Sequence, residues 1–304
     1  MKNGEIWQDV KGNDIQAHGG CIMQFEGKFY WYGEHKGIDN TPGQRRTDVI
    51  GVSCYSSDDL LNWTYEGLAL SAENDEKSML NPKNVLERPK VIYNEKTKKY
   101  VMWAHVDSPD YAFAGAGVAV SDSPKGPFKF LGAAQPNRQD CRDMTLFVDD
   151  DNVAYLVHST DWNKSLDIAR LTDDYTQTDG FYVTVMRDQL REAPALCKHN
   201  GVYYMVTSGC TGWMPNSALY STSEHILGQW KLIDNPCEGE NYRKTFYGQS
   251  TYIFSVNGNN YLMLDHWKPD DLKKSGYSIL PITYDEDGAM IITRQDEWKG
   301  LESL

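Results

Sequence analysis

The sequence lacks the signals that mark several large classes of protein. Nowhere do 18 apolar residues follow one another, and the first residues contain no apolar segment of a signal peptide. We therefore expect no membrane span and a cytoplasmic location, or a secreted one if a signal has been trimmed away. No long stretch repeats its apolar residues with the 3.6-residue period of a helix. An all-β protein is the fold class that remains.

Positive charge and paired cysteines are also scarce. Thirty Lys and Arg stand against 43 Asp and Glu, which gives a formal net charge of −13. Phosphate backbones and anionic lipids repel such a chain, so we expect neither nucleic acid nor a membrane as a partner. The six cysteines form no CxxC pair, which favours reduced core thiols over disulfides, and no group of residues has the spacing of a metal site. The oligomeric state does not follow from the sequence.

What the sequence has is a repeat. An apolar strand, a turn and a second strand rich in Tyr recur five times, at 20–33, 89–103, 144–158, 193–207 and 249–264. A further candidate hairpin follows each copy, within 50–63, 117–128, 166–180, 217–230 and 275–293. Repeats of roughly 50 residues built from strands are typical of propeller blades. The sequence predicts a five-bladed β-propeller with four antiparallel strands per blade, as a single domain over residues 1–304.

Polar residues recur where the first strand of a blade begins. Glu87, Asp143, Glu192 and Gln249 stand beside four of the apolar runs, and Glu34 follows the second strand of the first copy. Because the innermost strands of a propeller converge on one channel, we expect these side chains to share a pocket at its mouth. Crowded carboxylates drive their pKa values apart, as acid and base catalysis requires. Three of them have an arginine as immediate neighbour, so a salt-bridge role remains the alternative.

Two further residue types are open to two interpretations. His18 precedes two glycines, which allow the backbone to approach closely, and it is either a ligand-binding residue or a hydrogen-bonded structural one. Trp213 and Trp267 follow the second strands of the last two repeats. Each is either a ring at the mouth of the pocket or a packing residue between blades.

Together these motifs resemble a known family. They are IQAHGG (15–20), YWYGE (30–34), ERPKVIYN (87–94), RDM (142–144), REAPALCKHNGVYYMVTSGCTGW (191–213), GQSTYIF (248–254) and HWKPDDLKKSGYSILPI (266–282). In order and spacing they resemble glycoside hydrolase family 43, in particular its exo-β-1,3-galactanase branch. The resemblance implies an inverting exo-glycosidase that releases β-1,3-linked galactose from galactan or arabinogalactan-type glycans. We expect the catalytic domain alone in residues 1–304, without a counterpart of the carbohydrate-binding module that often follows it in this family.

The resemblance also implies roles for individual residues. Glu192 matches the general acid. The Asp that most members use as general base is replaced within AHGGCIM. In the galactanase branch a glutamine is proposed to act instead, and Gln249 occupies its place, while Glu87 remains a second candidate for base or water-positioning residue. Lys90 stands where many members have an Asp that tunes the acid.

The remaining implied residues bind the sugar. Glu34, Arg88, Tyr111, Asp143 and Thr211 match residues of the innermost subsite, with Asp143 also placed to raise the pKa of the acid, and Trp213 and Trp267 are the stacking candidates. No cofactor is required by the resemblance, which allows at most a structural cation in the central channel.

Two other functions remain open. An α-L-arabinofuranosidase or β-xylosidase of the same family would share the fold, but the loss of the blade-one Asp argues against it. A catalytically weak propeller that only binds glycans would tolerate that loss, whereas the retention of Glu192, Glu87 and Gln249 favours an enzyme.

Overall fold

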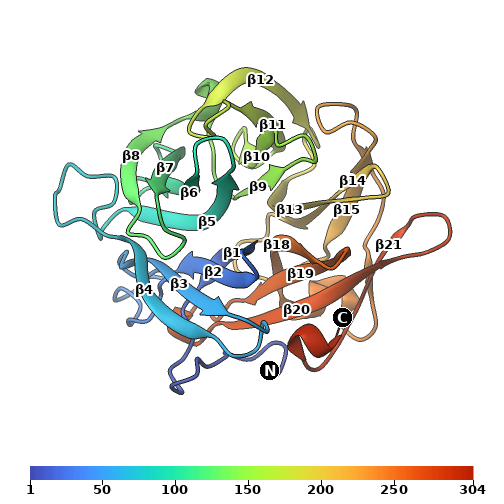
Figure 1. Cartoon of the computed structure of the whole chain (residues 1–304), viewed down its shortest axis with the longest axis horizontal. Helices are drawn as coiled ribbons and strands as arrows, with labels where there is room; N and C mark the ends of the chain where they lie inside the picture. Colours follow the sequence, from blue (N-terminus) through green and yellow to red (C-terminus); the bar gives the residue numbers. More distant parts are fainter. Residues whose placement is uncertain (304) are drawn as a thin grey trace.

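Each of the five repeats forms one antiparallel sheet, and the five sheets stand around a central axis (Figure 1). The computed structural model describes residues 1–303. Within each sheet the strands follow chain order from the axis outward, except for one short additional strand at the outer edge of blade five, so the strand that opens each repeat is innermost. The innermost strands contact one another around the ring. The predicted five-bladed propeller with four antiparallel strands per blade is confirmed.

The strands of the first three blades have the following bounds. Blade one comprises β1 (His18–Phe25), β2 (Lys28–Glu34), β3 (Gly51–Ser57) and β4 (Thr64–Ser71). Blade two comprises β5 (Val85–Asn94), β6 (Lys99–Asp107), β7 (Gly115–Ser121) and β8 (Lys129–Ala134). Blade three comprises β9 (Met144–Val148), β10 (Ala154–Thr160), β11 (Ser165–Leu171) and β12 (Thr178–Val185).

The last two blades are less regular at their outer edges. Blade four comprises β13 (Arg191–His199), β14 (Val202–Gly209), β15 (Leu219–Ser223) and the two-residue β16 (Lys231–Leu232). Blade five comprises β18 (Gln249–Val256), β19 (Asn259–His266), β20 (Gly276–Tyr284) and β21 (Met290–Thr293), with the short β17 (Cys237–Glu238) added in parallel to β21.

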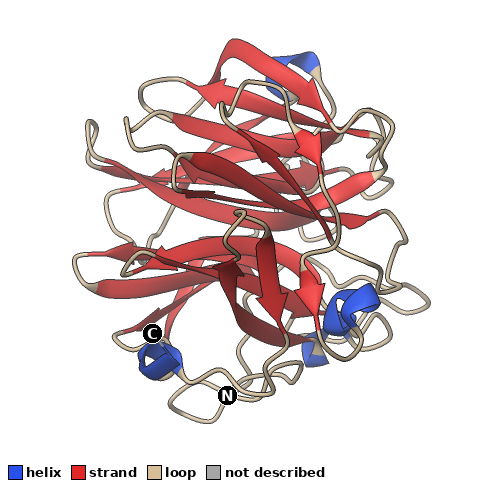
Figure 2. Cartoon of the chain, turned by 90° about the vertical axis from the view of Figure 1, so that its right-hand side faces the viewer, coloured by secondary structure: helices blue, strands red, loops and turns tan. Residues whose placement is uncertain are grey.

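In the part of the chain that the structure describes, the helical segments are short 3₁₀ helices at the periphery (Figure 2). They are η1 (Pro136–Arg138), η2 (Tyr242–Tyr247), η3 (Leu272–Lys274) and η4 (Gly300–Ser303). Within residues 1–303, none of the helices has the length and apolar character that crossing a membrane demands.

The sequence misplaced three outer strands. The segments 50–63, 117–128 and 217–230 were expected to contain whole hairpins, but β4, β8 and β16 begin only after Trp63, Phe128 and Trp230. In the first case the Asp59 carboxylate accepts hydrogen bonds from the backbone N–H groups of Leu61 and Asn62, which holds a turn at this point. Both tryptophans are buried in the packing between blades.

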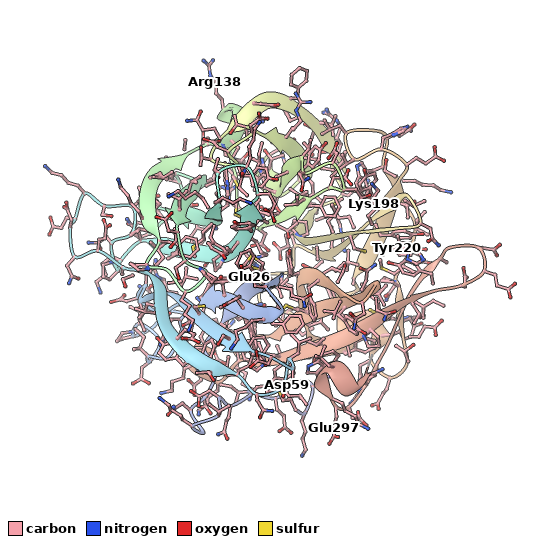
Figure 3. All side chains as sticks on the ribbon, viewed as in Figure 1. Glu26, Asp59, Arg138, Lys198, Tyr220 and Glu297 are labelled. Carbon is pink, nitrogen blue, oxygen red and sulfur yellow. The ribbon has the colours of Figure 1, made fainter. Side chains whose placement is uncertain are left out.

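Apolar side chains fill the five interfaces between neighbouring blades. The contact between blades five and one is the most aromatic, with Trp7, Trp31, Trp63, Tyr277 and Trp298 in one cluster. The other four interfaces have clusters of their own, built from alternate residues of the facing strands. Each sheet therefore buries both faces against its neighbours, while charged side chains such as Arg138 and Glu297 lie at the outer rim (Figure 3).

A β-bulge marks the start of the innermost strand in four of the five blades. Between two paired positions, β1, β5, β13 and β18 each contain one residue more than their partner strand. Gly19, Arg88 and Ala193 occupy three of these bulges with φ of 58°, 53° and 52°. A bulge bends its strand and redirects the side chains beside it. The bulges lie at the ends of the innermost strands where Glu87, Glu192 and Gln249 stand, whereas Asp143 precedes β9 of blade three, which pairs without a bulge.

The blade-one bulge requires its glycines. A Cβ on Gly19 would lie 2.2 Å from Glu34 Oε1, and one on Gly20 would lie 1.7 Å from the carbonyl oxygen of Tyr32. The close backbone approach expected from the two glycines is therefore present, and Gly19 also needs its left-handed conformation.

Candidate active site

Arg88 lies at the centre of the group of polar residues that the bulges bring together. Its guanidinium forms a two-point ion pair with Asp143, with Nε 3.1 Å from Oδ1 and Nη2 3.0 Å from Oδ2. Nη2 also donates to Gln249 Oε1 at 2.6 Å, while the backbone N–H of Arg88 donates to Glu34 Oε1 at 3.0 Å. One buried arginine thus fixes side chains from blades one, three and five relative to each other.

The amide of Gln249 has all of its hydrogen-bonding positions occupied. Oε1 accepts from Arg88 and, at 2.9 Å, from the indole N–H of Trp267. Nε2 donates to Glu192 Oε1 at 3.1 Å and to Ser208 Oγ at 3.0 Å. Arg88 and Trp267 can only donate, so this network determines which end of the amide is oxygen.

Glu192 lies in surroundings that keep it protonated at neutral pH. Burial raises the pKa of its carboxyl, and the charge of Asp143 raises it further, to about 8, against the opposing charge of Arg88. The adjoining Ala193 and Ala195 are buried and offer no solvation. The thiol of Cys210 lies against the same carboxyl. The charge of Asp143 thus acts on the pKa of Glu192 in the direction expected of a tuning carboxylate.

Glu87 has the opposite charge state. Burial opposes its ionisation, but the hydrogen bond and charge of His105, assisted by Lys36, lower the pKa of Glu87 to about 2. His105 Nδ1 lies 3.3 Å from Glu87 Oε2, and its Nε2 lies 3.0 Å from Asp107 Oδ2. These two carboxylates overcome the burial of His105 and raise its pKa to about 9. A buried imidazolium therefore holds Glu87 as a carboxylate.

Glu34 and Tyr111 complete the blade-one and blade-two side of the site. Glu34 is buried, and its Oε2 lies 2.7 Å from the ammonium nitrogen of Lys36. The Tyr111 hydroxyl donates to Glu87 Oε1 at 2.9 Å. A hollow between these two carboxylates is lined by Glu34, Lys36, Glu87 and Tyr111. Both tyrosine and carboxylates present groups that can bond hydroxyls of a ligand.

The predicted aromatic residues lie on the opposite side. Trp213 and Trp267 pack edge to face, with ring centroids 5.7 Å apart, and line a second hollow together with Gln249 and Asp265. Thr211 is in the same loop as Trp213, but its hydroxyl donates to the Met214 carbonyl and accepts from Asn216 Nδ2. The structure therefore brings every predicted side chain except that of Thr211 to the shared cluster or a hollow at its edge.

His18 lies behind the two tryptophans and supports Trp267. It is fully buried, and its ring stacks on Tyr277 with centroids 4.9 Å apart and lies 5.6 Å from Trp267. Its Nε2 lies 3.1 Å from the Tyr277 hydroxyl. Of the two interpretations, the structural one fits this position.

Beneath Arg88, at the floor of the site, side chains donate hydrogen bonds to backbone carbonyl oxygens of the innermost strands. Lys90 is fully buried, and its ammonium donates to the carbonyl oxygens of Gly19 at 2.7 Å and Arg88 at 3.2 Å. Ser250 and Thr251 similarly donate to carbonyls of neighbouring blades. Burial lowers the pKa of Lys90 to about 8. These inward carbonyl oxygens are thus engaged by an ammonium and two hydroxyls.

A structural cation does not fit this floor. Within residues 1–303 no three His, Cys, Asp or Glu side chains are grouped as metal ligands. An ammonium at the same place would repel a bound cation.

Several residues of the site were missed by the sequence prediction. They share a position directly across the hairpin from a predicted residue: His105 pairs with Glu87, Ser208 with Glu192, and Asp265 with Gln249. Counting outward from each hairpin turn misses all three by one position, because the bulge shifts the register and the count leads to Val106, Gly209 and His266 instead. Cys210 was expected in the core with the other five cysteines, which are buried, but it lies beside Glu192.

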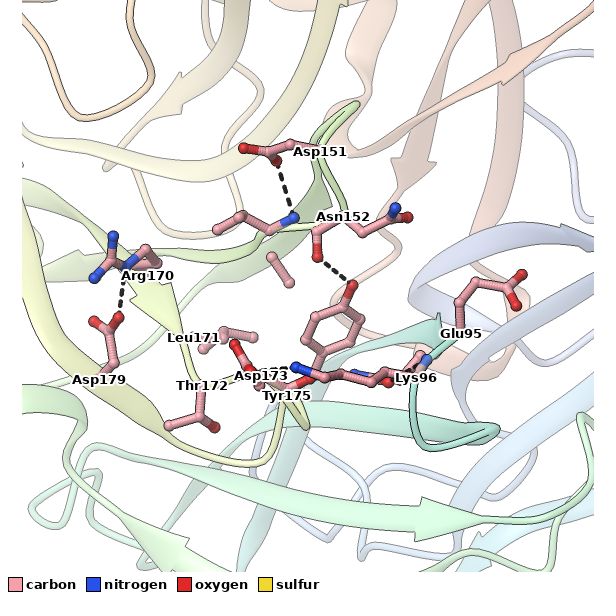
Figure 4. A pocket seen from close by; sticks show the side chains of 13 residues that line it. Glu95, Lys96, Asp151, Asn152, Arg170, Leu171, Thr172, Asp173, Tyr175 and Asp179 are labelled. Atoms are coloured by element: carbon pink, nitrogen blue, oxygen red, sulfur yellow. Dashed lines mark hydrogen bonds and ion pairs between the residues drawn. The ribbon is translucent and has the colours of Figure 1, made fainter.

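A larger hollow lies away from this cluster. It is between blades two and three, at the turn that joins β9 to β10, and Asp143 precedes the other end of β9. Figure 4 shows that its polar groups bond to each other, with Arg170 paired to Asp179 and the Tyr175 hydroxyl donating to the Asn152 carbonyl. It brings no acid and base together, so the mouth formed by the bulges is the candidate active site.

Similarity to known proteins extends over most of the chain. The family model for glycosyl hydrolases family 43 matches residues 22–290. A family 43 β-1,3-galactosidase solved with galactodeoxynojirimycin is 40% identical, with a TM-score of 0.94, over 98% of this chain and 99% of that one. An exo-β-1,3-galactanase from Phanerochaete chrysosporium, solved with galactose, is 36% identical, with a TM-score of 0.88, over 97% of this chain and 67% of that one.

A curated relative is more distant. The β-D-galactofuranosidase of Aspergillus niger is 25% identical over 224 residues, which are 70% of this chain. The matched region spans 64% of that relative, so it covers less than two thirds of its length.

Proposed function

This chain belongs to the glycosyl hydrolases of family 43 and is a glycoside hydrolase, and we propose that it is an inverting exo-β-1,3-galactosidase. The observation that carries the proposal is the contact between Glu192, a carboxyl with a pKa of about 8, and the fully bonded amide of Gln249. The names of the similar solved enzymes, β-1,3-galactosidase and exo-β-1,3-galactanase, support the choice of substrate.

Glu192 acts as the general acid. At neutral pH it is protonated, so it can give its proton to the glycosidic oxygen as the bond from that oxygen to the anomeric carbon breaks. Arg88 and Asp143 lie beside it as an ion pair, so one positive and one negative charge are already fixed before a cation develops on the sugar.

Gln249 handles the attacking water. Two donors on its Oε1, one of them the charged Arg88, stabilise negative charge on that oxygen and make the Nε2–H groups more acidic. After Glu192 has lost its proton, Nε2–H can pass to the Glu192 carboxylate, and the amide then takes a proton from water as the water oxygen bonds to the anomeric carbon. The water supplies one hydroxyl and one proton, and both side chains return to their starting forms.

Glu87 is the second candidate for this role. It is ionised, and a carboxylate with a pKa of about 2 is a weak base that can still orient a water molecule through its free lone pairs. All four hydrogen-bonding positions of the Gln249 amide are occupied, so it can take a proton from water only if it gives one up elsewhere. Loss of an Nε2 proton to Glu192 meets that condition, which favours the amide relay. Variants at the two positions separate these roles.

The other two functions have less support. An arabinofuranosidase or xylosidase would need a different base, and the position after His18 is a glycine that no side chain can replace without striking Glu34. A protein that only binds glycans would not need Glu192 to be protonated at neutral pH.

The test is hydrolysis of β-1,3-galactobiose and β-1,3-galactan, followed in real time by proton NMR. We expect α-galactose as the first product, released from the non-reducing end, and a loss of several orders of magnitude in turnover for Glu192→Gln. Glu224→Gln, which changes an exposed glutamate of the same blade, is the matched control. First release of β-galactose, or cleavage of arabinofuranosides or xylosides alone, would refute the proposal.

The water-handling step has a separate test. We expect Gln249→Ala to regain turnover in azide, with α-galactosyl azide as product, because azide needs no proton removed before it attacks. Rescue of Glu87→Ala by azide, with Gln249→Ala inert, would assign the step to Glu87.

A further inference from the structure

An exposed tryptophan stands at the rim of the active site on blade three. Trp162 lies in the four-residue turn between β10 and β11, and 70% of it is exposed. The turn is at the end of the blade that carries Asp143, because the backbone N–H of Ser159, near the end of β10, donates to the Asp143 carbonyl. A single exposed apolar side chain is ordinary at a protein surface, so a role for Trp162 depends on how the ring is held and where the turn lies.

This ring is held in place from below. The guanidinium carbon of Arg142 lies 4.4 Å from its centroid, so one face is covered by a cation–π contact. The Asp140 carboxylate accepts the backbone N–H groups of Asp161 at 2.7 Å and Trp162 at 2.9 Å, and it also pairs with Arg142. The indole therefore has one bound face and one free face.

The backbone of the turn indicates that the side chain is kept for a reason. Asp161, Trp162 and Asn163 all have positive φ, of 50°, 55° and 62°. Asp and Asn tolerate this conformation, but Trp is disfavoured in it, and a glycine would form the same turn without strain. Strain of this kind persists where the surrounding structure enforces it, and it clusters at binding sites.

The turn lies on the side of the general acid. The Cys210 thiol is 3.6 Å from the carbonyl oxygen of Asn163 and also lies against the Glu192 carboxyl. A general acid protonates the oxygen of the leaving group, so the sugars that leave must pass along the wall next to it. Trp162 is adjacent to Asn163 on that wall.

We propose that the free face of Trp162 is a stacking platform for a galactose residue of the leaving chain. The inference rests on the proposed function and adds a second subsite to it. The axial hydroxyl of galactose leaves one face of the ring rich in C–H groups, and such a face packs on an aromatic ring. Because Arg142 and Asp140 fix the indole beforehand, binding loses little side-chain entropy.

The test compares Trp162→Ala with wild type on β-1,3-galactotriose and on galactose as a competitive inhibitor. Loss of one stacked sugar corresponds to about a tenfold fall in kcat/KM for the triose. The inhibition constant of galactose should not change, because galactose alone occupies the subsite of the cleaved residue. Trp162→Phe, which keeps an aromatic face, should retain most of the activity.

Phe181→Ala is the matched control. Phe181 is 62% exposed and also stacks on an arginine, with Arg170 4.4 Å from its centroid, but it lies on the outermost strand of the same blade. It should leave all constants unchanged. A Trp162→Ala enzyme equal to wild type on the triose would overturn the platform, and so would an equal loss for galactose.

A binding measurement separates this inference from the proposed function. Calorimetry of galactotriose with the Glu192→Gln protein and with the same protein also carrying Trp162→Ala should show about tenfold weaker binding in the second. If wild type cleaves no galactotriose but this difference in binding persists, the proposed function fails and the platform stands. Equal binding by both proteins, or none by either, refutes the platform.

Discussion

The charge of Asp143 should set the pH at which this enzyme loses activity. In the native protein Asp143 raises the pKa of Glu192, and the ion pair with Asp143 limits how strongly Arg88 lowers it. Asp143→Asn removes the negative charge and leaves that of Arg88 unbalanced. Both changes lower the pKa of Glu192, so the protonated form of the acid is lost at a lower pH.

The size of the effect follows from the neighbouring charges. A like charge in direct proximity shifts a carboxyl by roughly 1–2 pKa units. With Glu192 starting near 8, a shift of about 1.5 units lowers its protonated fraction at pH 7 from about nine tenths to about one quarter. Protonation alone then reduces the rate at pH 7 about fourfold, in addition to any loss of contacts with the sugar.

The assay is the pH dependence of kcat/KM on β-1,3-galactobiose, whose alkaline limb reports the pKa of the free acid. The readout is the pH at which the alkaline limb falls, and not the maximal value of kcat/KM, because Asp143 is also expected to touch substrate. Asp149→Asn is the control, since Asp149 lies at the opposite end of blade three and pairs with Lys198. An alkaline limb that stays in place in Asp143→Asn would show that Asp143 does not tune Glu192.

Four further predictions concern stability and metal dependence. The pKa of His105 is raised to about 9, so the stability that its charge contributes is complete below its unfolded pKa of about 6.5 and is lost as the pH rises through 9. The Tm of wild type should fall over this window, and a plot of Tm against pH should be flatter for His105→Gln. Parallel plots for the two proteins would refute the charged imidazolium. The pKa of Glu192 is also raised, so wild type loses stability between about pH 4.5 and 8; Glu192→Gln should gain Tm relative to wild type as pH rises through that range, and a gain independent of pH would argue against the buried acid. Gly19→Ala should cost about 2–3 kcal/mol in urea unfolding, because its Cβ would displace Glu34 and its φ is left-handed, and an unchanged midpoint would contradict this close approach. Lys90→Met should cost about 2 kcal/mol by leaving two buried carbonyls without a donor, and EDTA should leave the wild-type Tm unchanged; a lower Tm in EDTA would indicate a bound cation.

Local pattern was sufficient to predict the fold. Alternation of apolar and polar residues defines the strands, and the Tyr-rich second strands give the length of the repeat. Five strand-built repeats of this length are typical of propeller blades and of few other folds. The same logic placed Glu87, Asp143, Glu192 and Gln249 together, because the starts of innermost strands must meet at one end of the ring.

The hydrogen bonds that hold the site together join residues far apart in the sequence, and a local sequence pattern does not predict them. Arg88 bonds Asp143 and Gln249, which lie 55 and 161 positions further along the chain, and the direction of its side chain depends on a bulge that no propensity predicts for an arginine. Cys210 had the signature of a core cysteine until blades three and four were placed side by side. Contacts between blades, together with the one-residue register shift at each bulge, were the part beyond sequence reasoning.

The bulges separate architecture from chemistry in this ring. Each one takes a single residue out of the ladder, so strand pairing resumes on both sides of it. In blade one that residue has to be a glycine, because a Cβ on Gly19 would strike Glu34. In the other three blades a change of side chain at the bulge acts mainly at the mouth, so an engineer who wants a new specificity from this scaffold can vary those three positions and keep the apolar interfaces between the sheets.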